Sequence, residues 1–150
     1  MNILPVILSC KKNKHLWKNI IEKIPDCVIF CGDETLETNY TLENNILYLK
    51  CNDFYEGLPE KIIAMLNVIN TDPLFSDITH IIKIDDHDTE IKANFKQSIK
   101  FNEQLIVKNH YLGQRINRPY RKGYLNKPTL VVDVNWHIGK CSPLSEWNYK

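Results

Sequence analysis

Ile3-Leu4-Pro5-Val6-Ile7-Leu8 is a continuous apolar run, as in a strand that is buried on both faces of a sheet. Residues 14–24 follow with apolar side chains at three- and four-residue intervals, which predicts an amphipathic helix that ends at Pro25. A second apolar run over residues 27–31 closes at Gly32-Asp33. This order of strand, helix and strand is typical of a parallel α/β sheet with helices on both faces.

The rest of the chain continues this alternation. We expect a loop over 34–45, a strand over 46–49, a helix that begins near Pro59, a strand over 80–84, a helix over 91–105 and a last strand over 130–134. The predicted fold class is therefore α/β, with a mostly parallel sheet flanked by helices in a single domain over residues 1–150. Ligands of such sheets bind beyond the carboxyl ends of the strands.

Composition narrows the class of protein. The 150 residues carry a net charge of +1, which argues against a general electrostatic binder of nucleic acid. No apolar run approaches the roughly 20 residues that span a bilayer, and the N-terminal run lacks the basic segment of a signal peptide. The five cysteines show no metal-finger spacing, so we expect buried free thiols in a reducing compartment, the cytoplasm.

Three carboxylates, Asp85, Asp86 and Asp88, follow the strand expected over 80–84. Like charges at this spacing repel one another, and a divalent cation such as Mg²⁺ or Mn²⁺ removes the conflict. Because side chains alternate along an extended chain, two pairs are open as ligands: Asp86 with Asp88, or Asp85 with His87. The alternative to a metal site is a solvated acidic turn in which Asp88 caps a helix.

A second polar segment, Asp53-Phe54-Tyr55-Glu56-Gly57-Leu58-Pro59-Glu60-Lys61, precedes this cluster and is expected at the same edge of the sheet. Lys61 falls close to the start of the helix that begins near Pro59. Backbone N–H groups at a helix start also favour a phosphate, so Lys61 is a candidate phosphate contact. The alternative is an ordinary surface lysine.

Together, the two segments resemble the β-1,3-galactosyltransferase-like glycosyltransferases of the GT-A fold. That family has the pattern D-x-Y-x-N-L-x-x-K followed by K-x-D-D-D. The matching residues here are Asp53, Tyr55, Leu58 and Lys61, and then Lys83-Ile84-Asp85-Asp86-His87-Asp88. A weaker echo lies in Gly113 and in Pro119-Tyr120-Arg121-Lys122, so the resemblance covers roughly residues 3–125.

The resemblance implies a Rossmann-like GT-A domain that binds a UDP-sugar through Mn²⁺ or Mg²⁺ and transfers the sugar to a glycan or protein acceptor. It assigns the donor contacts to Ser9, Cys10, Lys11, Asp33, Asp53, Tyr55, Lys61, Asp85 and Asp86. It assigns the metal to Asp86, His87, Asp88 and the late His137. Asp88 is the direct ligand if His87 is an insertion in the triple aspartate, and His87 takes its place if it is not. The alternative for His137, beside Trp136, is a structural or exposed histidine.

The chain departs from the family towards its end. The family's glycine-rich acceptor segment and its acidic catalytic base have no counterpart here, so the catalytic residue is unassigned. Three interpretations are open: a donor-binding half that needs a partner chain or a second copy, a chain truncated on the acceptor side, or a compact transferase with an open acceptor site.

The three arginines, Arg115, Arg118 and Arg121, lie within seven residues of one another among tyrosines. We expect them to contact an acceptor or a phosphate, the alternative being a solvated basic loop. Stacking on single-stranded nucleic acid would need the same residue types, but the near-neutral net charge argues against it.

Two other functions are compatible with the acidic cluster. A nucleotidyltransferase or metal nuclease also uses clustered carboxylates and divalent ions, although the chain has no glycine-rich phosphate loop. A non-catalytic nucleotide-sugar binding module would bind UDP and a metal without turning over a donor.

Overall fold

A computed structural model of the protein describes residues 2–87. The helices and strands of this part are β1 (Ile3–Leu8), α1 (Lys14–Lys23), β2 (Val28–Gly32), β3 (Tyr40–Glu43), β4 (Ile46–Leu49), α2 (Leu58–Thr71) and β5 (His80–Asp85). Short 3₁₀ turns precede α1, α2 and β5, as η1 (Lys11–Asn13), η2 (Tyr55–Gly57) and η3 (Pro73–Phe75). The predicted helix over 91–105 and strand over 130–134 lie outside the described residues.

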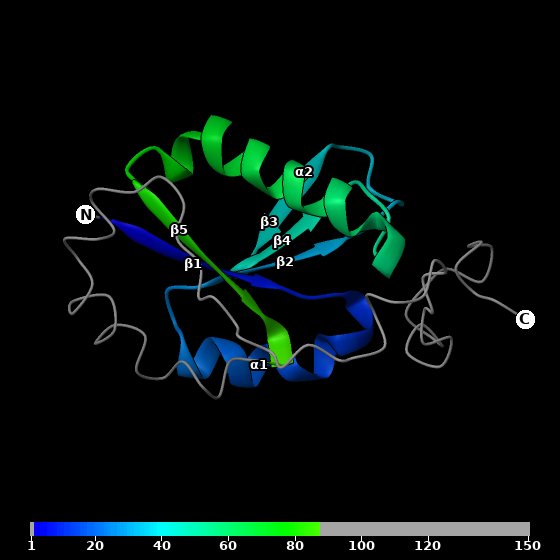
Figure 1. Ribbon diagram of the computed structural model, residues 1–150, viewed down its shortest axis with the longest axis horizontal. Helices are drawn as coiled ribbons and strands as arrows, with labels where there is room; N and C mark the ends of the chain where they lie inside the picture. The colour runs from blue at the N-terminus through cyan, green and yellow to red at the C-terminus, as the bar shows by residue number, and fades with distance from the viewer. Residues whose placement is uncertain (1, 88–150) are drawn as a thin grey trace, which may run out of the picture.

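The strands form one sheet in the order β3-β4-β2-β1-β5 (Figure 1). β1 pairs in parallel with both β2 and β5, and β2 pairs in parallel with β4, whereas β3 runs antiparallel to β4. α1 covers one face of the sheet and α2 covers the other (Figure 1). For the described residues, this confirms the α/β class with a mostly parallel sheet flanked by helices.

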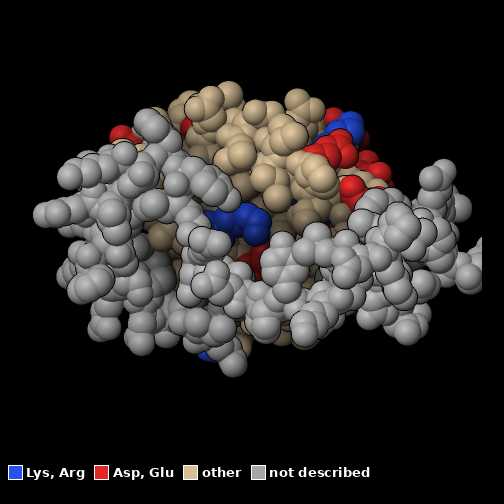
Figure 2. All heavy atoms as spheres, in the orientation of Figure 1, with Lys and Arg blue, Asp and Glu red and all other residues tan. Residues whose placement is uncertain are grey.

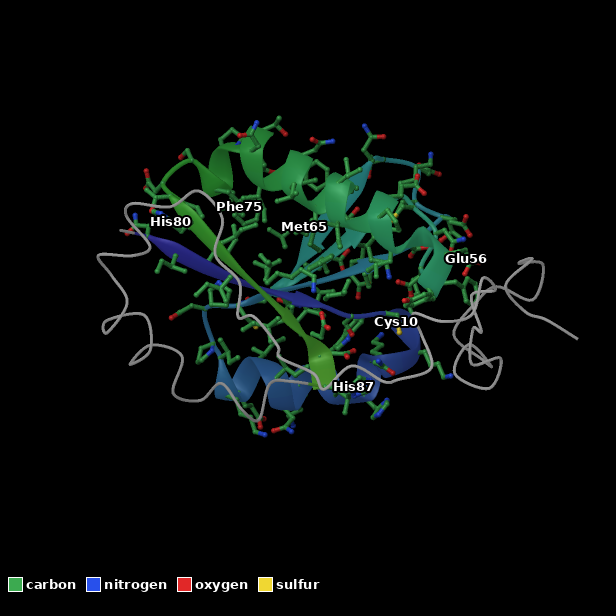
Figure 3. The ribbon with its side chains drawn as sticks, in the orientation of Figure 1. Cys10, Glu56, Met65, Phe75, His80 and His87 are labelled. Carbon is green, nitrogen blue, oxygen red and sulfur yellow. The ribbon has the colours of Figure 1, made fainter. Side chains whose placement is uncertain are left out.

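Each face of the sheet has its own apolar core. Side chains alternate along β1, so that Val6 packs in the core that contains Met65 and Phe75, while Ile7 packs in the core that contains Trp17. Figure 3 shows Met65 and Phe75 between α2 and the sheet. Both β1 side chains are fully buried, which stabilises the fold by about 1.5–3 kcal/mol for each. Burial on both faces is why β1 and β2 are apolar without interruption.

α2 begins near Pro59, as its sequence predicts. Its apolar side chains do not all lie on the buried face, because Ile63 and Leu66 are exposed. A proline in the first turn is compatible with a helix start, because its missing N–H would have no intrahelical partner there. Its buried residues, Lys61, Met65 and Val68, recur at four- and three-residue intervals on the face that packs on the sheet. Among residues 2–87, no helix has the length and apolarity that crossing a membrane requires.

The loop predicted over 34–45 is wrong in its second half, where β3 forms a hairpin with β4. The register pairs Glu43 with Ile46, so the turn consists of Asn44 and Asn45 alone. Both asparagines have positive φ, 47° and 69°, as a two-residue type I′ hairpin turn requires. The Asn-Asn dipeptide is therefore the signal in the sequence that identifies β3. A half-exposed edge strand lacks the apolar run of the inner strands.

The described cysteines are free thiols, as expected. Cys27, Cys31 and Cys51 are buried, and Cys10 is half-buried. Burial raises the pKa of Cys31 to about 12 and that of Cys27 and Cys51 to about 11. At neutral pH these groups are uncharged, and they pack as small apolar side chains.

Candidate functional site

A pocket of about 650 Å³ opens at the carboxyl edge of the sheet. Its walls come from the segments that follow β1, β2, β4 and β5 and from the first turns of α2. Figure 3 shows Cys10 and His87 towards this end of the molecule, whereas His80 lies at the other end of β5. The described lining residues are Leu8, Ser9, Cys10, Lys11, Lys12, Asn13, Gly32, Asp33, Glu34, Thr35, Asp53, Phe54, Tyr55, Leu58, Lys61, Asp85, Asp86 and His87.

The pocket gathers the predicted site residues of the described part. All nine residues assigned to donor contact line it, namely Ser9, Cys10, Lys11, Asp33, Asp53, Tyr55, Lys61, Asp85 and Asp86. His87, assigned to the metal, lines it as well. They come from five separate segments of the chain, and the parallel sheet brings those segments to one edge. The remaining predicted site residues lie outside the described residues, namely Asp88, His137, Arg115, Arg118 and Arg121.

The pocket includes the point where the order of strand addition reverses. β2 and β4 lie on one side of β1 and β5 lies on the other, so β1 and β5 flank a topological switch point. Open α/β sheets bind their ligands in the crevice at such a point. Ser9 directly follows β1 and Asp86 directly follows β5. The Ser9 hydroxyl donates a 2.8 Å hydrogen bond to Oδ2 of Asp86, and this bond links the ends of β1 and β5.

A hydrogen-bond network on the α1 side fixes the carboxylate of Asp86. Oδ2 of Asp86 also accepts a 2.7 Å hydrogen bond from Nδ2 of Asn13, and the Ser9 hydroxyl accepts one of 2.8 Å from the indole N–H of Trp17. Ser9, Trp17 and Asp86 are all buried. Because a buried polar group is costly without partners, these bonds hold the Asp86 side chain in one orientation.

Asp85 and His87 have a different environment from Asp86. The Asp85 side chain is 54% exposed, and its Oδ1 pairs with Nζ of Lys83 at 2.6 Å. The His87 ring is 74% exposed, with Nε2 at 3.5 Å from Oδ1 of Asp86. Of the two pairs left open by the sequence, Asp85 and His87 are the solvent-facing one, while Asp86 is buried.

Lys61 is buried, so its interpretation as a surface lysine is wrong. Its side chain is 4% exposed, and Nζ donates to Oδ1 of Asp53 at 2.7 Å. Nζ also donates to the backbone carbonyls of Asp53 at 3.1 Å and of Ser9 at 3.2 Å. The ammonium group therefore joins α2 to the segments that follow β1 and β4. The sequence places Lys61 near the start of α2, and its burial on the inner face and its partners depend on the tertiary fold.

A second ion pair bridges the segments that follow β1 and β2. Nζ of Lys11 lies 2.6 Å from Oδ2 of Asp33. Oδ1 of Asp33 accepts hydrogen bonds from the hydroxyl and the N–H of Thr35. The Lys11 ammonium, with the Thr35 donors, lowers the pKa of Asp33 to about 2, so the carboxylate is ionised at neutral pH.

Cys10 does not have the surroundings of a nucleophile. Burial raises the pKa of its thiol above the usual value and outweighs the opposite effect of a hydrogen bond from the backbone N–H of Asn13. A thiol is reactive when its pKa is lowered, which is the opposite shift. Cys10 therefore lines the pocket as a neutral thiol.

The sequence did not identify three residues that shape this site. Asn13 and Trp17 hold the network around Asp86, and Gly32 allows close approach of the chain at Asp53. Trp17 is one of the apolar residues of the helix expected over 14–24, and that pattern accounts for its buried ring but not for its indole N–H. The only sequence signal for Gly32 is its position at the end of a buried strand.

The described lining carries more negative than positive charge. Its five carboxylates, Asp33, Glu34, Asp53, Asp85 and Asp86, stand against three lysines, Lys11, Lys12 and Lys61. Figure 2 shows basic and acidic side chains next to each other in a hollow near the centre of the face in view. Within residues 2–87, no three or more His, Cys, Asp or Glu side chains gather as they would around a metal ion.

Comparison of the chain with protein-family models, with curated proteins and with solved structures finds no match. The chemistry of the pocket therefore has to be inferred from its own residues.

Proposed function

We propose that the chain binds a UDP-sugar together with Mn²⁺ or Mg²⁺ in the pocket at the carboxyl edge, and that it is a metal-dependent glycosyltransferase. The observation that carries this proposal is convergence. The nine residues that the resemblance assigns to one donor site all line one pocket, which includes a topological switch point. Spacing along the chain does not by itself bring these segments together.

The charge of the lining supports a role for a cation. Lys11 is already paired with Asp33, and Lys61 is already paired with Asp53. A diphosphate entering an acidic pocket is repelled unless a cation accompanies it. Mg²⁺ is commonly held by one or two carboxylates together with substrate phosphates and water, so it does not need a cage of three protein ligands.

The residues of the chain have separate parts in this proposal. Asp85 and His87 face solvent beside the pocket and are suited to a cation, whereas Asp86 is suited to hold the end of β5 through Ser9 and Asn13. Phe54 and Tyr55 are more than a third exposed and give the pocket an aromatic side on which a base can stack. A bound cation supplies Lewis-acid stabilisation of the departing diphosphate.

Calorimetric titration of UDP tests the proposal. We expect binding in the presence of Mn²⁺ and its loss in EDTA. Asp85→Asn should weaken the metal-dependent binding by about tenfold or more, because a charged ligand of the cation is removed. Asp77→Asn is the matched control, since Asp77 is an exposed carboxylate just before β5, at the opposite edge of the sheet. UDP binding that is absent, or equal in EDTA and in Asp85→Asn, contradicts the proposal.

Turnover separates the transferase from the alternatives. A transferase hydrolyses at least one UDP-sugar slowly in Mn²⁺ when no acceptor is present, and the loss of this activity in EDTA and in Asp85→Asn ties it to the pocket. Metal-dependent UDP binding with no hydrolysis of any UDP-sugar would identify a non-catalytic binding module. Cleavage of DNA or RNA in Mn²⁺ would identify a nuclease.

A further inference from the structure

Asp53 is surrounded by hydrogen-bond donors from three different segments. Its Oδ1 accepts from the N–H of Gly32 at 2.6 Å and from Nζ of Lys61 at 2.7 Å. Its Oδ2 accepts from the N–H of Lys11 at 2.7 Å. The three donors come from the end of β2, from α2 and from the turn between β1 and α1. Both carboxylate oxygens are thus engaged by groups of the chain itself.

This arrangement has the form of an anion-binding point. Backbone N–H groups at the turn after the first strand hold the phosphate of a nucleotide in doubly wound α/β folds, and here the N–H of Lys11 has that position in the chain. Here the carboxylate of Asp53, instead of a phosphate, accepts the hydrogen bond from this N–H. Gly32 makes the approach possible, because a Cβ at that position would lie 2.7 Å from Cα of Asp53.

We propose that Asp53 is a positioning residue that acts as a built-in anion. Its carboxylate fills the point formed by the N–H groups of Lys11 and Gly32 and the ammonium of Lys61. By doing so, it fixes the segments after β1 and β2 in the shape of the pocket. It also keeps a ligand's phosphate away from this point. That last consequence rests on the proposed function, and it replaces the expected role of Asp53 as a direct contact of the donor.

Chemical rescue by formate tests the first part. Asp53→Gly removes the carboxylate and leaves three donors around an empty space. We expect this variant to have a lower melting temperature than the wild type in chloride. Formate at equal ionic strength should raise the melting temperature of this variant by roughly 2–8 °C, because a small carboxylate that binds only the folded state stabilises that state.

Two controls make the rescue specific. Asp53→Asn fills the space with a neutral amide, so formate should not raise its melting temperature beyond the wild-type response. Asp72→Gly removes a carboxylate that accepts bonds from the hydroxyl of Tyr40 and the N–H of Leu74, away from this point. It should be destabilised and not rescued. If formate raises the melting temperature of all variants alike, or leaves Asp53→Gly unchanged, the proposal is overturned.

A second measurement decides the matter if Asp53→Gly does not fold in either salt. The amide proton resonances of Lys11 and Gly32 in the full chain report on their acceptor, because a hydrogen bond to a charged group is stronger than one to a neutral group. Both should move upfield in Asp53→Asn and stay in place in Asp72→Asn. Unchanged Lys11 and Gly32 resonances in Asp53→Asn would overturn the proposal. Neither experiment uses UDP, so its failure is distinguishable from a failure of donor binding.

Discussion

The hydroxyl of Ser9 and Oδ2 of Asp86 are 2.8 Å apart, although 77 residues separate them in the sequence. Their contact closes the ends of β1 and β5, which pair in register from Ile3 with His80 to Leu8 with Asp85. The same hydroxyl accepts the indole N–H of Trp17, so α1 is joined to both strands. One small side chain therefore connects three elements at the edge of the pocket.

Ser9→Ala should lower the free energy of unfolding by about 1–3 kcal/mol, because the buried indole N–H of Trp17 loses its acceptor and Asp86 loses one donor. Urea denaturation measures the change. Ser76→Ala is the control, since Ser76 is exposed, and it should stay within about 0.5 kcal/mol of the wild type. Equal stability of the two variants would contradict the network.

Lys61→Met should lower the free energy of unfolding by more than Ser9→Ala does, by about 3 kcal/mol. The substitution leaves the largely buried carboxylate of Asp53 without its cation. Guanidinium denaturation gives the free energy of unfolding. Lys50→Met should have little effect, because Lys50 is exposed. The double variant Lys61→Met/Asp53→Asn should lose less than the sum of the single variants, because the two residues are in contact. Simple additivity would show that the pair does not interact.

Asp33 should give the fold a pH-dependent stability. Its carboxyl has a pKa of about 2 in the folded chain against the usual 3.8, because of the Lys11 ammonium and Thr35. The ionised form thus stabilises the fold above pH 3.8, and this stabilisation is lost as the pH falls through about 2. Asp33→Asn should cost about 1 kcal/mol or less at neutral pH. The difference from the wild type should shrink towards pH 2. Urea denaturation at a series of pH values measures the free energy of unfolding of both proteins. A difference between them that stays constant with pH would contradict this ion pair.

The two asparagines of the hairpin turn should respond differently to the same substitution. Glycine accepts positive φ at both positions, so only side-chain contacts distinguish the variants. Nδ2 of Asn45 donates to the carbonyls of Pro25 at 3.0 Å and Cys27 at 2.8 Å, whereas Asn44 makes no side-chain hydrogen bond within residues 2–87. Asn45→Gly should lower the free energy of unfolding by about 1–2 kcal/mol. Asn44→Gly should leave it within about 0.5 kcal/mol of the wild-type value. Thermal unfolding compares them, and the reverse ranking would contradict the turn geometry.

β1 and β2 were predictable because a strand buried on both faces is apolar at nearly every position. β1, β2, β4 and β5 were found within a residue or two of their bounds. β3 was not found, since its four residues, Tyr40–Glu43, are exposed or half-exposed and form no apolar run.

The site was predictable as a place and not as a set of contacts. The rule that ligands bind at the carboxyl edge was enough to expect Asp53 near Asp85. Whether Ser9 lies opposite Asp86 depends on the register of β1 against β5, and the sequence leaves that register open. The partners of Lys61 could not be predicted for a related reason, because one of the groups that it binds, the carbonyl of Ser9, lies 52 residues away.

The position of β1 between β2 and β5 has a consequence for folding during synthesis. β1 is made first and can pair with β2 once residue 32 has left the ribosome, but its other edge has to wait for β5 at residues 80–85. At 5–20 residues per second, this interval lasts about 3–10 s. An unpaired apolar edge is a template for another chain. The nascent protein therefore has a period in which a chaperone or another nascent chain can compete with β5 for the free edge of β1.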